Sequence, residues 1–256
     1  MFGMMMLDFS IVTVSYNSAL TISETIDSVL SQKGVDFEYI IIDGGSKDNT
    51  LEIIKSYNDP RVKYISEPDD GLYNAMNKGL KLASGEVVAI LNSDDLYTHE
   101  LVLDRVKNEF LFNSSDIVSG HIYYFDEDKN IKGRVYKCSD YLCSSQWLDG
   151  WQPPHPSTFV KKVVYDNVGE YSECYKISSD YDFLFRALYL NKFKHSVIDE
   201  YLVAMRTGGE STRSFGAIIK GNKEVREILK SHGVHISKLF TAKKITKKLF
   251  NKFSRK

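Results

Sequence analysis

The sequence has few of the features that mark secreted or membrane-spanning proteins. Its three cysteines (Cys138, Cys143 and Cys174) are too few, and odd in number, for a disulfide framework, so we expect reduced thiols. No apolar run reaches the roughly 18 residues of a spanning helix. The opening stretch MFGMMMLDF has no basic segment and is interrupted by Asp8, which makes it a poor signal peptide. We therefore expect a cytoplasmic protein.

An excess of positive charge is also missing. The formal net charge is -1 over 256 residues, which argues against a general nucleic-acid partner. The C-terminal end is different, because eight basic residues and no acidic one follow Ser237. Ala242, Ile245, Leu249 and Phe253 recur there at helical spacing. This pattern predicts a basic amphipathic helix on an anionic membrane surface, and a solvated, partly frayed tail is the alternative.

The first part of the chain alternates between short apolar runs and helical patterns. Strands are predicted at 9–14, 37–43, 62–65 and 87–91, and helices from about 21, at 50–57 and at 72–80. Thr21 and Glu24 predict a capping box at the first helix. Continuous apolar strands separated by helices indicate a parallel sheet wrapped by helices, an α/β fold.

The second part is less regular. Residues 117–138 predict two antiparallel strands around a turn, followed by an aromatic, proline-bearing loop and a helix near Ser179. We find no internal repeat and no low-complexity linker. One continuous domain is the simplest interpretation.

Carboxylates follow two of the predicted strands. Asp43 ends the second strand, and the adjacent Asp94 and Asp95 follow the fourth, at the sheet edge where α/β proteins bind ligands. Turn chemistry explains Asp43 equally well. Two carboxylates about 4 Å apart repel by roughly 1 kcal/mol in water, and more where water is scarce. A divalent cation removes that repulsion, so the pair predicts a site for Mg²⁺ or Mn²⁺ with a diphosphate rather than a turn.

A third carboxylate cluster lies in the sequence SSDYDF. Ser179 and Asp182 have the spacing of a capping box, which gives Asp182 a structural role. Asp180 then has no capping task at the first helical position, and the helix N-terminus favours its ionised form. Asp180 is therefore the candidate general base.

Six motifs in order resemble one family: SIVTVSYN, IIDGGSKDNT, SEPDDGLYNAMNKGLKLASGE, LNSDD, HPSTFV and SDYDFLFR. Together they resemble the inverting family 2 glycosyltransferases of the GT-A fold, over roughly residues 8–215. The resemblance implies a mostly parallel central sheet flanked by helices, with a small antiparallel element. It also implies a domain at 1–215, with a donor half at 8–96, an acceptor half at 97–215 and a tail at 216–256.

The resemblance assigns roles to individual residues. Asn92 stands where the family has an acidic residue, which leaves Asp94 as the metal ligand and Asp95 near the sugar. Asp180 takes the place of the catalytic base. The residues implied in binding the donor are Thr13, Val14, Ser15, Asp43, Asp70, Asn92, Ser93 and Asp95.

Three further residues are candidates for contact with the acceptor or the diphosphate. Each of them has an alternative interpretation. His155 could be a structural histidine, Trp151 could be a packing residue, and Arg206 could belong to a surface loop. Tyr16 and Tyr73 are interpreted as packing residues.

The resemblance implies a metal-assisted transferase that moves a hexose or N-acetylhexosamine from a nucleotide sugar. It favours a UDP-sugar as the donor. The acceptor would be a hydroxyl of a glycan or of an undecaprenyl-diphosphate-linked saccharide, as in bacterial surface-polysaccharide assembly. Two alternatives remain. A sugar nucleotidyltransferase needs a glycine-rich, basic loop after the first strand, where this chain has SYNSALTISET. A non-catalytic carbohydrate-binding protein has no use for both Asp94 and Asp180 at the sheet edge.

Overall fold

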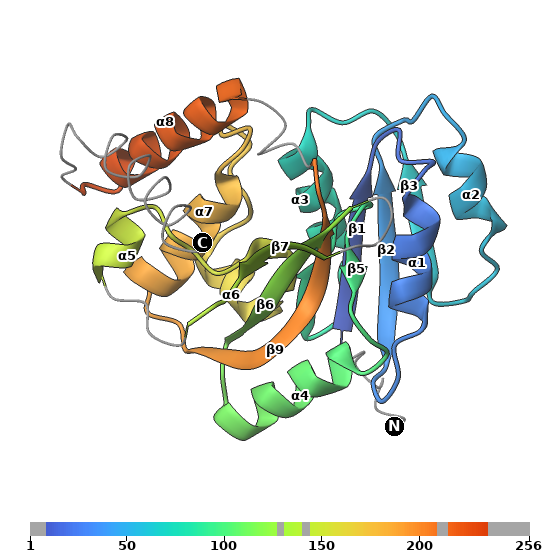
Figure 1. The fold of residues 1–256 in the computed structure, drawn as a ribbon, viewed down its shortest axis with the longest axis horizontal. Helices are drawn as coiled ribbons and strands as arrows, with labels where there is room; N and C mark the ends of the chain where they lie inside the picture. The colour runs from blue at the N-terminus through green and yellow to red at the C-terminus, as the bar shows by residue number, and fades with distance from the viewer. Residues whose placement is uncertain (1–8, 127–130, 140–143, 209–214, 235–256) are drawn as a thin grey trace.

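The computed structural model describes residues 9–126, 131–139, 144–208 and 215–234. Within these residues a nine-stranded sheet runs in the order β3-β2-β1-β4-β8-β6-β9-β5, with β7 paired to β6 (Figure 1). The elements are β1 (Phe9–Ser15), α1 (Ile22–Leu30), β2 (Phe37–Asp43), α2 (Thr50–Ser56), β3 (Val62–Ser66), α3 (Leu72–Leu82), β4 (Val87–Ile90), β5 (Leu96–Tyr97), α4 (Val102–Asn113), β6 (Ile117–Phe125), β7 (Ile131–Tyr136), α5 (Ser144–Leu148), the 3₁₀-helix η1 (His155–Ser157), β8 (Thr158–Lys161), α6 (Lys162–Val168), α7 (Ser179–Leu184), the π-helix η2 (Phe185–Leu190), β9 (His195–Arg206) and α8 (Phe215–Ser231).

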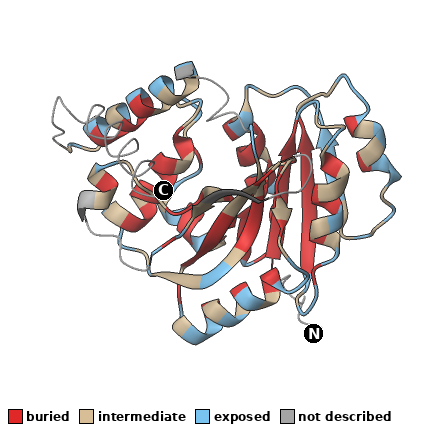
Figure 2. Cartoon of the chain, viewed as in Figure 1, coloured by how far each residue is buried: buried red, intermediate tan, exposed pale blue. Residues whose placement is uncertain are grey.

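The strands predicted in the first part are confirmed, and they pair in parallel. β1 lies between β2 and β4, and β3 forms the outer edge. β1, β2 and β4 are buried along their whole length because helices cover both faces of the sheet (Figure 2). One face packs on α3, α6, α7 and α8, and the other on α1, α2 and α4. Parallel pairing brings the residues after β1, β2 and β4 to one edge.

Two capping boxes predicted from the sequence are not formed. Thr21 precedes α1, but its hydroxyl donates to the carbonyl of Ser18 (3.4 Å) and makes no cap bond. Ser178, not Ser179, is the N-cap position of α7. A Ser or Thr three residues before an acidic residue matches the motif by spacing alone, and Ser179 Oγ is buried without a hydrogen-bond partner among the described residues.

The second part contains strands that the sequence pattern did not reveal. β6 and β7 form the predicted antiparallel pair, and β8 inserts antiparallel between β4 and β6. The long β9 runs parallel to β6 and pairs with the short β5, and α4 begins after β5, at Val102. Strands of both predicted halves thus join in one sheet, and the division into donor and acceptor halves stays a prediction.

The helix α8 begins the predicted tail and packs onto the fold. Val225, Ile228 and Leu229 are buried in the same cluster as α7. The basic segment at 235–256 lies outside the described residues, so its amphipathic helix stays a prediction. Among the described residues, no helix is long and apolar enough to cross a membrane.

A buried carboxylate, that of Glu38, lies at the edge of the sheet where the parallel strands begin. Glu38 on β2 is 2% exposed and accepts hydrogen bonds from Lys63 Nζ (2.7 Å), Ser10 Oγ (2.6 Å) and the backbone N–H of Ser84 (2.7 Å). Burial raises the pKa of Glu38, but the hydrogen bonds outweigh burial and lower the pKa to about 2. Glu38 therefore stabilises the fold as an anion.

We expect Glu38→Gln to lower the free energy of unfolding at pH 7 by up to roughly 3 kcal/mol. Because the folded pKa lies below the ordinary 4.5, this contribution is complete above pH 4.5 and disappears as pH falls through about 2. Urea unfolding at several pH values measures it, with the exposed Glu52→Gln as control. A difference between variant and wild type that does not shrink on acidification would contradict the assignment to charge.

Candidate active site

Asp43 is the last residue of β2 and binds the loop that follows it. It is fully buried, and its carboxylate accepts hydrogen bonds from the backbone N–H and the hydroxyl of Ser46, from Ser66 Oγ (2.6 Å) and from Ser15 Oγ (3.5 Å). Asp43 thus joins β1, β2 and β3 at their carboxyl ends, as turn chemistry predicts. Its contact with a nucleotide base stays a prediction.

The end of β1 divides its side chains between core and surface. Thr13 is fully buried, and its hydroxyl accepts a hydrogen bond from Tyr39 Oη (3.0 Å), so this side chain serves the core rather than the crevice. Val14 and Ser15 are both 5% exposed. Tyr16 is 60% exposed, so the interpretation of Tyr16 as a packing residue is wrong. β1 is thus buried to its last residue, and exposure begins at Tyr16, directly after the strand.

The loop after β1 is tied to the loop after β2. Three successive backbone N–H groups, those of Asn17, Ser18 and Ala19, donate to Ser46 Oγ (2.8 Å), Thr50 Oγ1 (2.7 Å) and Asp48 Oδ2 (3.1 Å). A loop that cradles phosphates instead presents such groups to its ligand. This arrangement disfavours a nucleotidyltransferase of the phosphate-cradling type.

The adjacent carboxylates after β4 lie in a place that disfavours their charges. Asp95 is 1% exposed and accepts a hydrogen bond from Asn92 Nδ2 (2.9 Å), while Asp94 is partly exposed. Burial raises the pKa of Asp94. Burial, with the charge of Asp94 added, raises the pKa of Asp95 well above its usual range. The Asn92 side chain therefore binds Asp95. The positive charge near the two carboxylates does not compensate for their burial.

Arg206, at the end of β9, supplies part of that charge. It lowers the pKa of both Asp94 and Asp95, although burial dominates. Its guanidinium stacks on Phe125 at 4.7 Å and binds Glu24 Oε2 at 3.1 Å, and its Nε is buried without a hydrogen-bond partner among the described residues. The structure thus places Arg206 with the carboxylate pair rather than in a surface loop.

The carboxylate pair fits a cation that arrives with its substrate. No group of three or more His, Cys, Asp or Glu side chains among the described residues is arranged to hold a metal. Mg²⁺ and similar cations use one or two carboxylates and take their other ligands from water and substrate phosphates. Asp94, partly exposed beside the buried Asp95, meets this requirement.

A second polar group surrounds Asp180 at the start of α7. Asp180 Oδ2 accepts from Gln152 Nε2 (2.7 Å), and Oδ1 accepts from the backbone N–H of Tyr181 (2.8 Å) and from Tyr73 Oη (3.3 Å). Gln152 was not predicted, because a glutamine in an irregular loop carries no pattern. Tyr73 is buried but also touches the carboxylate, so the packing interpretation of Tyr73 is incomplete.

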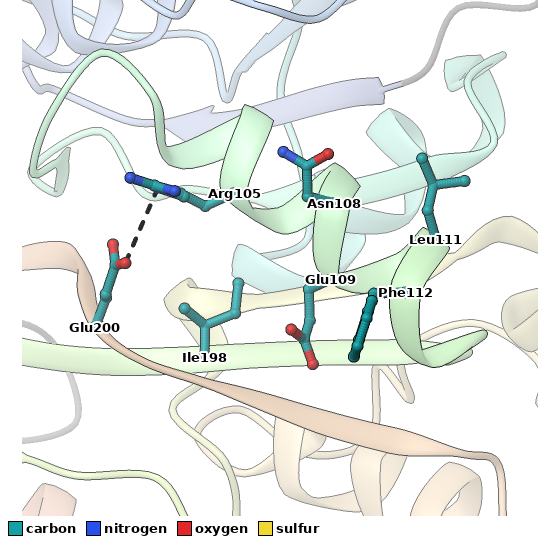
Figure 3. A pocket seen from close by; sticks show the side chains of 7 residues that line it. All are labelled: Arg105, Asn108, Glu109, Leu111, Phe112, Ile198 and Glu200. Atoms are coloured by element: carbon teal, nitrogen blue, oxygen red, sulfur yellow. Dashed lines mark ion pairs between the residues drawn. The ribbon is translucent and has the colours of Figure 1, made fainter.

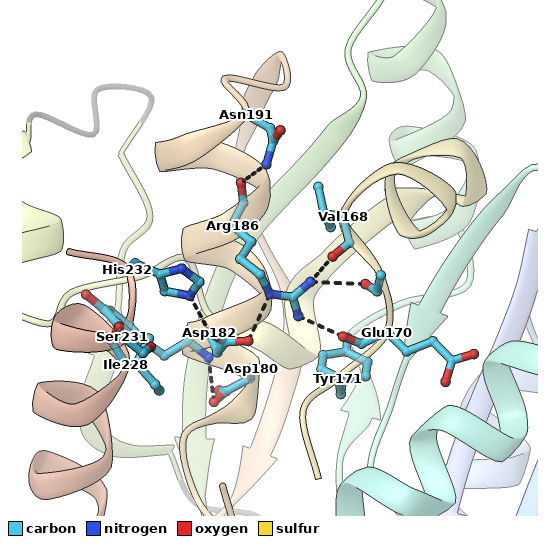
Figure 4. A network of polar contacts seen from close by, with 12 residues as sticks. Val168, Glu170, Tyr171, Asp180, Asp182, Arg186, Asn191, Ile228, Ser231 and His232 are labelled. Carbon is cyan, nitrogen blue, oxygen red and sulfur yellow. Dashed lines mark hydrogen bonds and ion pairs between the residues drawn. The ribbon is translucent and has the colours of Figure 1, made fainter. Parts of the chain in front are cut away.

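Asp182 turns away from Asp180. Arg186 Nε donates to Asp182 Oδ2 (2.9 Å), and His232 Nε2 lies 3.0 Å from Oδ1 (Figure 4). Arg186 also binds the backbone carbonyls of Val168, Gly169 and Glu170. The structural role predicted for Asp182 is thus confirmed, through this network instead of a cap.

The aromatic loop before β8 contributes support. His155 Nε2 lies 2.8 Å from Tyr171 Oη, and burial lowers the pKa of His155 while the charge of Asp180 raises it. This favours the structural interpretation of a neutral histidine. Trp147 is in the core, and Trp151 stacks on Tyr136 with ring centroids 6.1 Å apart.

The remaining donor candidates lie on loops near these groups. Ser93 Oγ is 2.8 Å from Ser18 Oγ, which joins the carboxylate pair to the loop after β1. Asp70 is exposed, and its carbonyl accepts from Lys176 Nζ (3.0 Å), which joins the loop before α3 to the segment before α7. A cavity of about 610 Å³ between α4 and β9 contains none of the predicted residues (Figure 3).

The sequence itself places this chain in a family. The model of "Glycosyl transferase family 2" matches residues 10–183. The chain is a family 2 glycosyltransferase. An uncharacterized glycosyltransferase of Methanocaldococcus jannaschii is 30% identical over 210 residues, which cover 77% of this chain and 70% of the relative. A PGL/p-HBAD biosynthesis glycosyltransferase of Mycobacterium tuberculosis is 27% identical over 75% of this chain and 76% of its own length.

Solved structures confirm the GT-A fold of this glycosyltransferase. Staphylococcus aureus TarS 1-349 in complex with UDP-GlcNAc has a TM-score of 0.69 at 21% identity, over 97% of this chain and 73% of that one. The mannosyltransferase PcManGT of Pyrobaculum calidifontis, in complex with GDP-Man and Mn²⁺, has a TM-score of 0.65 at 15% identity, over 89% of this chain and 64% of that one. This chain spans 44% of the longer TarS chain.

Proposed function

We propose that this glycosyltransferase moves a hexose or N-acetylhexosamine from a UDP-sugar to a hydroxyl group of a saccharide acceptor, with inversion at the anomeric carbon. The observation that carries the proposal is the Asp94–Asp95 pair, two carboxylates held at the carboxyl edge of the sheet where burial and mutual repulsion disfavour both charges. A diphosphate with its cation removes that conflict.

Asp94 would hold Mn²⁺ or Mg²⁺ together with the donor diphosphate. When bound, the cation stabilises the negative charge that develops on the departing diphosphate. Asp95, whose carboxylate is held by Asn92, would lie on the side of the donor sugar. Arg206 adds a fixed positive charge beside the pair, where the diphosphate would lie.

Asp180 would act as the general base. The acceptor oxygen attacks the anomeric carbon, the bond from that carbon to the diphosphate breaks, and Asp180 accepts the hydroxyl proton. The N–H of Tyr181 holds Oδ1, and Gln152 holds Oδ2, so the carboxylate is oriented before the acceptor arrives. Direct displacement inverts the configuration of the donor carbon.

The proposed donor is a UDP-sugar, and the proposed acceptor is lipid-linked. TarS, a structural neighbour, was solved with UDP-GlcNAc, which favours a UDP-sugar here. The basic segment at 235–256 supports contact with an anionic membrane surface, where a lipid-linked acceptor would be reached. Co-sedimentation with anionic vesicles measures that membrane contact, and equal sedimentation of a chain ending at Ser237 would contradict it.

A panel of nucleotide sugars with Mn²⁺ tests the proposed function. We expect a UDP-sugar to raise the melting temperature and to release UDP slowly to water, and faster with saccharide acceptors, whereas GDP- and CMP-sugars do neither. Thermal shift and coupled UDP detection measure these results. Release of pyrophosphate from a nucleoside triphosphate and a sugar phosphate would instead identify a nucleotidyltransferase.

A further inference from the structure

The helix α8 lies beyond residue 183, where the family match ends, yet it touches the segment that leads into α7. Glu224 on α8 is 7% exposed and points at that segment. Its Oε1 accepts from the backbone N–H of Lys176 (3.1 Å), and its Oε2 accepts from those of Ile177 (2.9 Å) and Ser178 (2.9 Å). One carboxylate therefore binds three successive backbone N–H groups.

These bonds solve a local problem of the backbone. N–H groups at the approach to a helix have no intrahelical partner, and leaving them buried and unpaired is costly. An ionised acceptor forms stronger hydrogen bonds than a neutral one. Ser178 Oγ adds a bond to the carbonyl of Gly221 (3.1 Å), where the lack of a side chain lets α8 approach Ile177 closely.

The same segment is also held from the side of α3. Tyr73 Oη donates to the carbonyl of Ile177 (2.8 Å) and lies 3.3 Å from Asp180 Oδ1. Glu224 accepts a hydrogen bond from the N–H of Ser178, which belongs to the same peptide group as the carbonyl of Ile177, so this peptide group is fixed at both ends. Asp180 follows Ser178 by two residues. Glu224 and Tyr73 thus hold from two sides the segment that leads directly to Asp180.

We propose that Glu224 is a positioning residue for the general base, and that α8 is part of the catalytic apparatus. Glu224 acts through the backbone of residues 176–178 and does not touch substrate. This inference rests on the proposed function, because it takes Asp180 as the base. Val225, Ile228 and Leu229 are buried in the core and keep α8 docked when Glu224 is changed.

Glu224→Gln tests the proposal. The variant keeps the side-chain shape, but its amide nitrogen cannot accept a hydrogen bond, so part of the segment loses its anchor. We expect kcat per folded molecule to fall about tenfold or more, because small displacements of a reacting group are costly, while the Kd for UDP changes by less than about twofold. UDP release from the fastest UDP-sugar of the panel, with Mn²⁺ and well below the melting temperature, measures kcat, and calorimetry measures Kd.

The matched control is Glu227→Gln on the same helix, where the carboxylate is half exposed and lies 3.8 Å from Lys223. It should leave kcat unchanged. Wild-type kcat in Glu224→Gln would overturn the inference. If Glu224→Gln does not fold, Glu224→Asp decides, because it keeps the charge but shortens the side chain by one methylene group; a fall in kcat is expected, and an unchanged kcat would overturn the inference.

Asp180→Asn, measured in parallel, separates this inference from the proposed function. Turnover in that variant would overturn the base assignment and this inference with it. Loss of turnover in Asp180→Asn combined with wild-type kcat in Glu224→Gln would overturn only the role of Glu224.

Discussion

Asp180→Asn is expected to lower turnover by roughly 10²- to 10⁴-fold, equivalent to about 3 to 5 kcal/mol of activation barrier. An amide cannot take the proton of the acceptor hydroxyl, so the attacking oxygen keeps it until late in the reaction. The amide oxygen can still accept the N–H of Tyr181, so the fold at α7 is retained. UDP binding should be unchanged, because Asp180 acts on the acceptor side.

The matched control for this variant lies two residues away. Asp182→Asn removes the same charge from the same helix but affects the contacts with Arg186 and His232 (Figure 4). We expect it to lower the melting temperature and to leave kcat per folded molecule nearly unchanged. Steady-state kinetics and calorimetry of both variants measure the difference. Near wild-type turnover in Asp180→Asn would mean that another group is the base.

Asp94→Asn is expected to have opposite effects on stability and on donor binding. The raised pKa of Asp94 means that its charge is disfavoured in the metal-free fold, so the contribution is unfavourable at pH 7 and is relieved as pH falls. Removing the charge should therefore raise the free energy of unfolding without metal. In the presence of Mn²⁺, the loss of a cation ligand should weaken UDP binding by roughly tenfold or more and lower turnover further.

Two measurements decide this prediction. Urea unfolding without metal gives the stability change, and calorimetry with UDP, with and without Mn²⁺, gives the binding change. Asp36→Asn removes an exposed carboxylate near the opposite edge of the sheet and should change neither quantity. If the response of Asp94→Asn to Mn²⁺ equals that of the wild type, Asp94 is not the cation ligand.

The parallel part of the sheet was predictable because its strands are buried on both faces. Continuous apolar runs such as those of β1 and β2 are typical of strands in a parallel sheet. Parallel pairing then brings Asp43 and Asp94 to one edge. β9 was not predictable from pattern. Several of its residues are only partly buried, so the run from His195 to Arg206 lacks the apolar signal of a core strand.

The residues that support the site were harder to find than the carboxylates they serve. Asp180 was identified by its place at the start of a helix, whereas Gln152 and Glu224 reach it, directly or through the backbone, only by tertiary folding. Arg206 was a candidate for contact with the acceptor or the diphosphate, with a surface loop as the alternative, and its contact with Glu24 also depends on tertiary folding. Local sequence patterns carry no information about such long-range contacts.

The side-chain bonds to Asn17, Ser18 and Ala19 have a consequence for the kinetics of binding. Protein side chains alone hold the loop after β1, so binding of the proposed nucleotide there should cost little conformational entropy. These amides should exchange with deuterium slowly even in the free protein. Association at this edge should therefore be limited by diffusion of the nucleotide rather than by rearrangement of the chain.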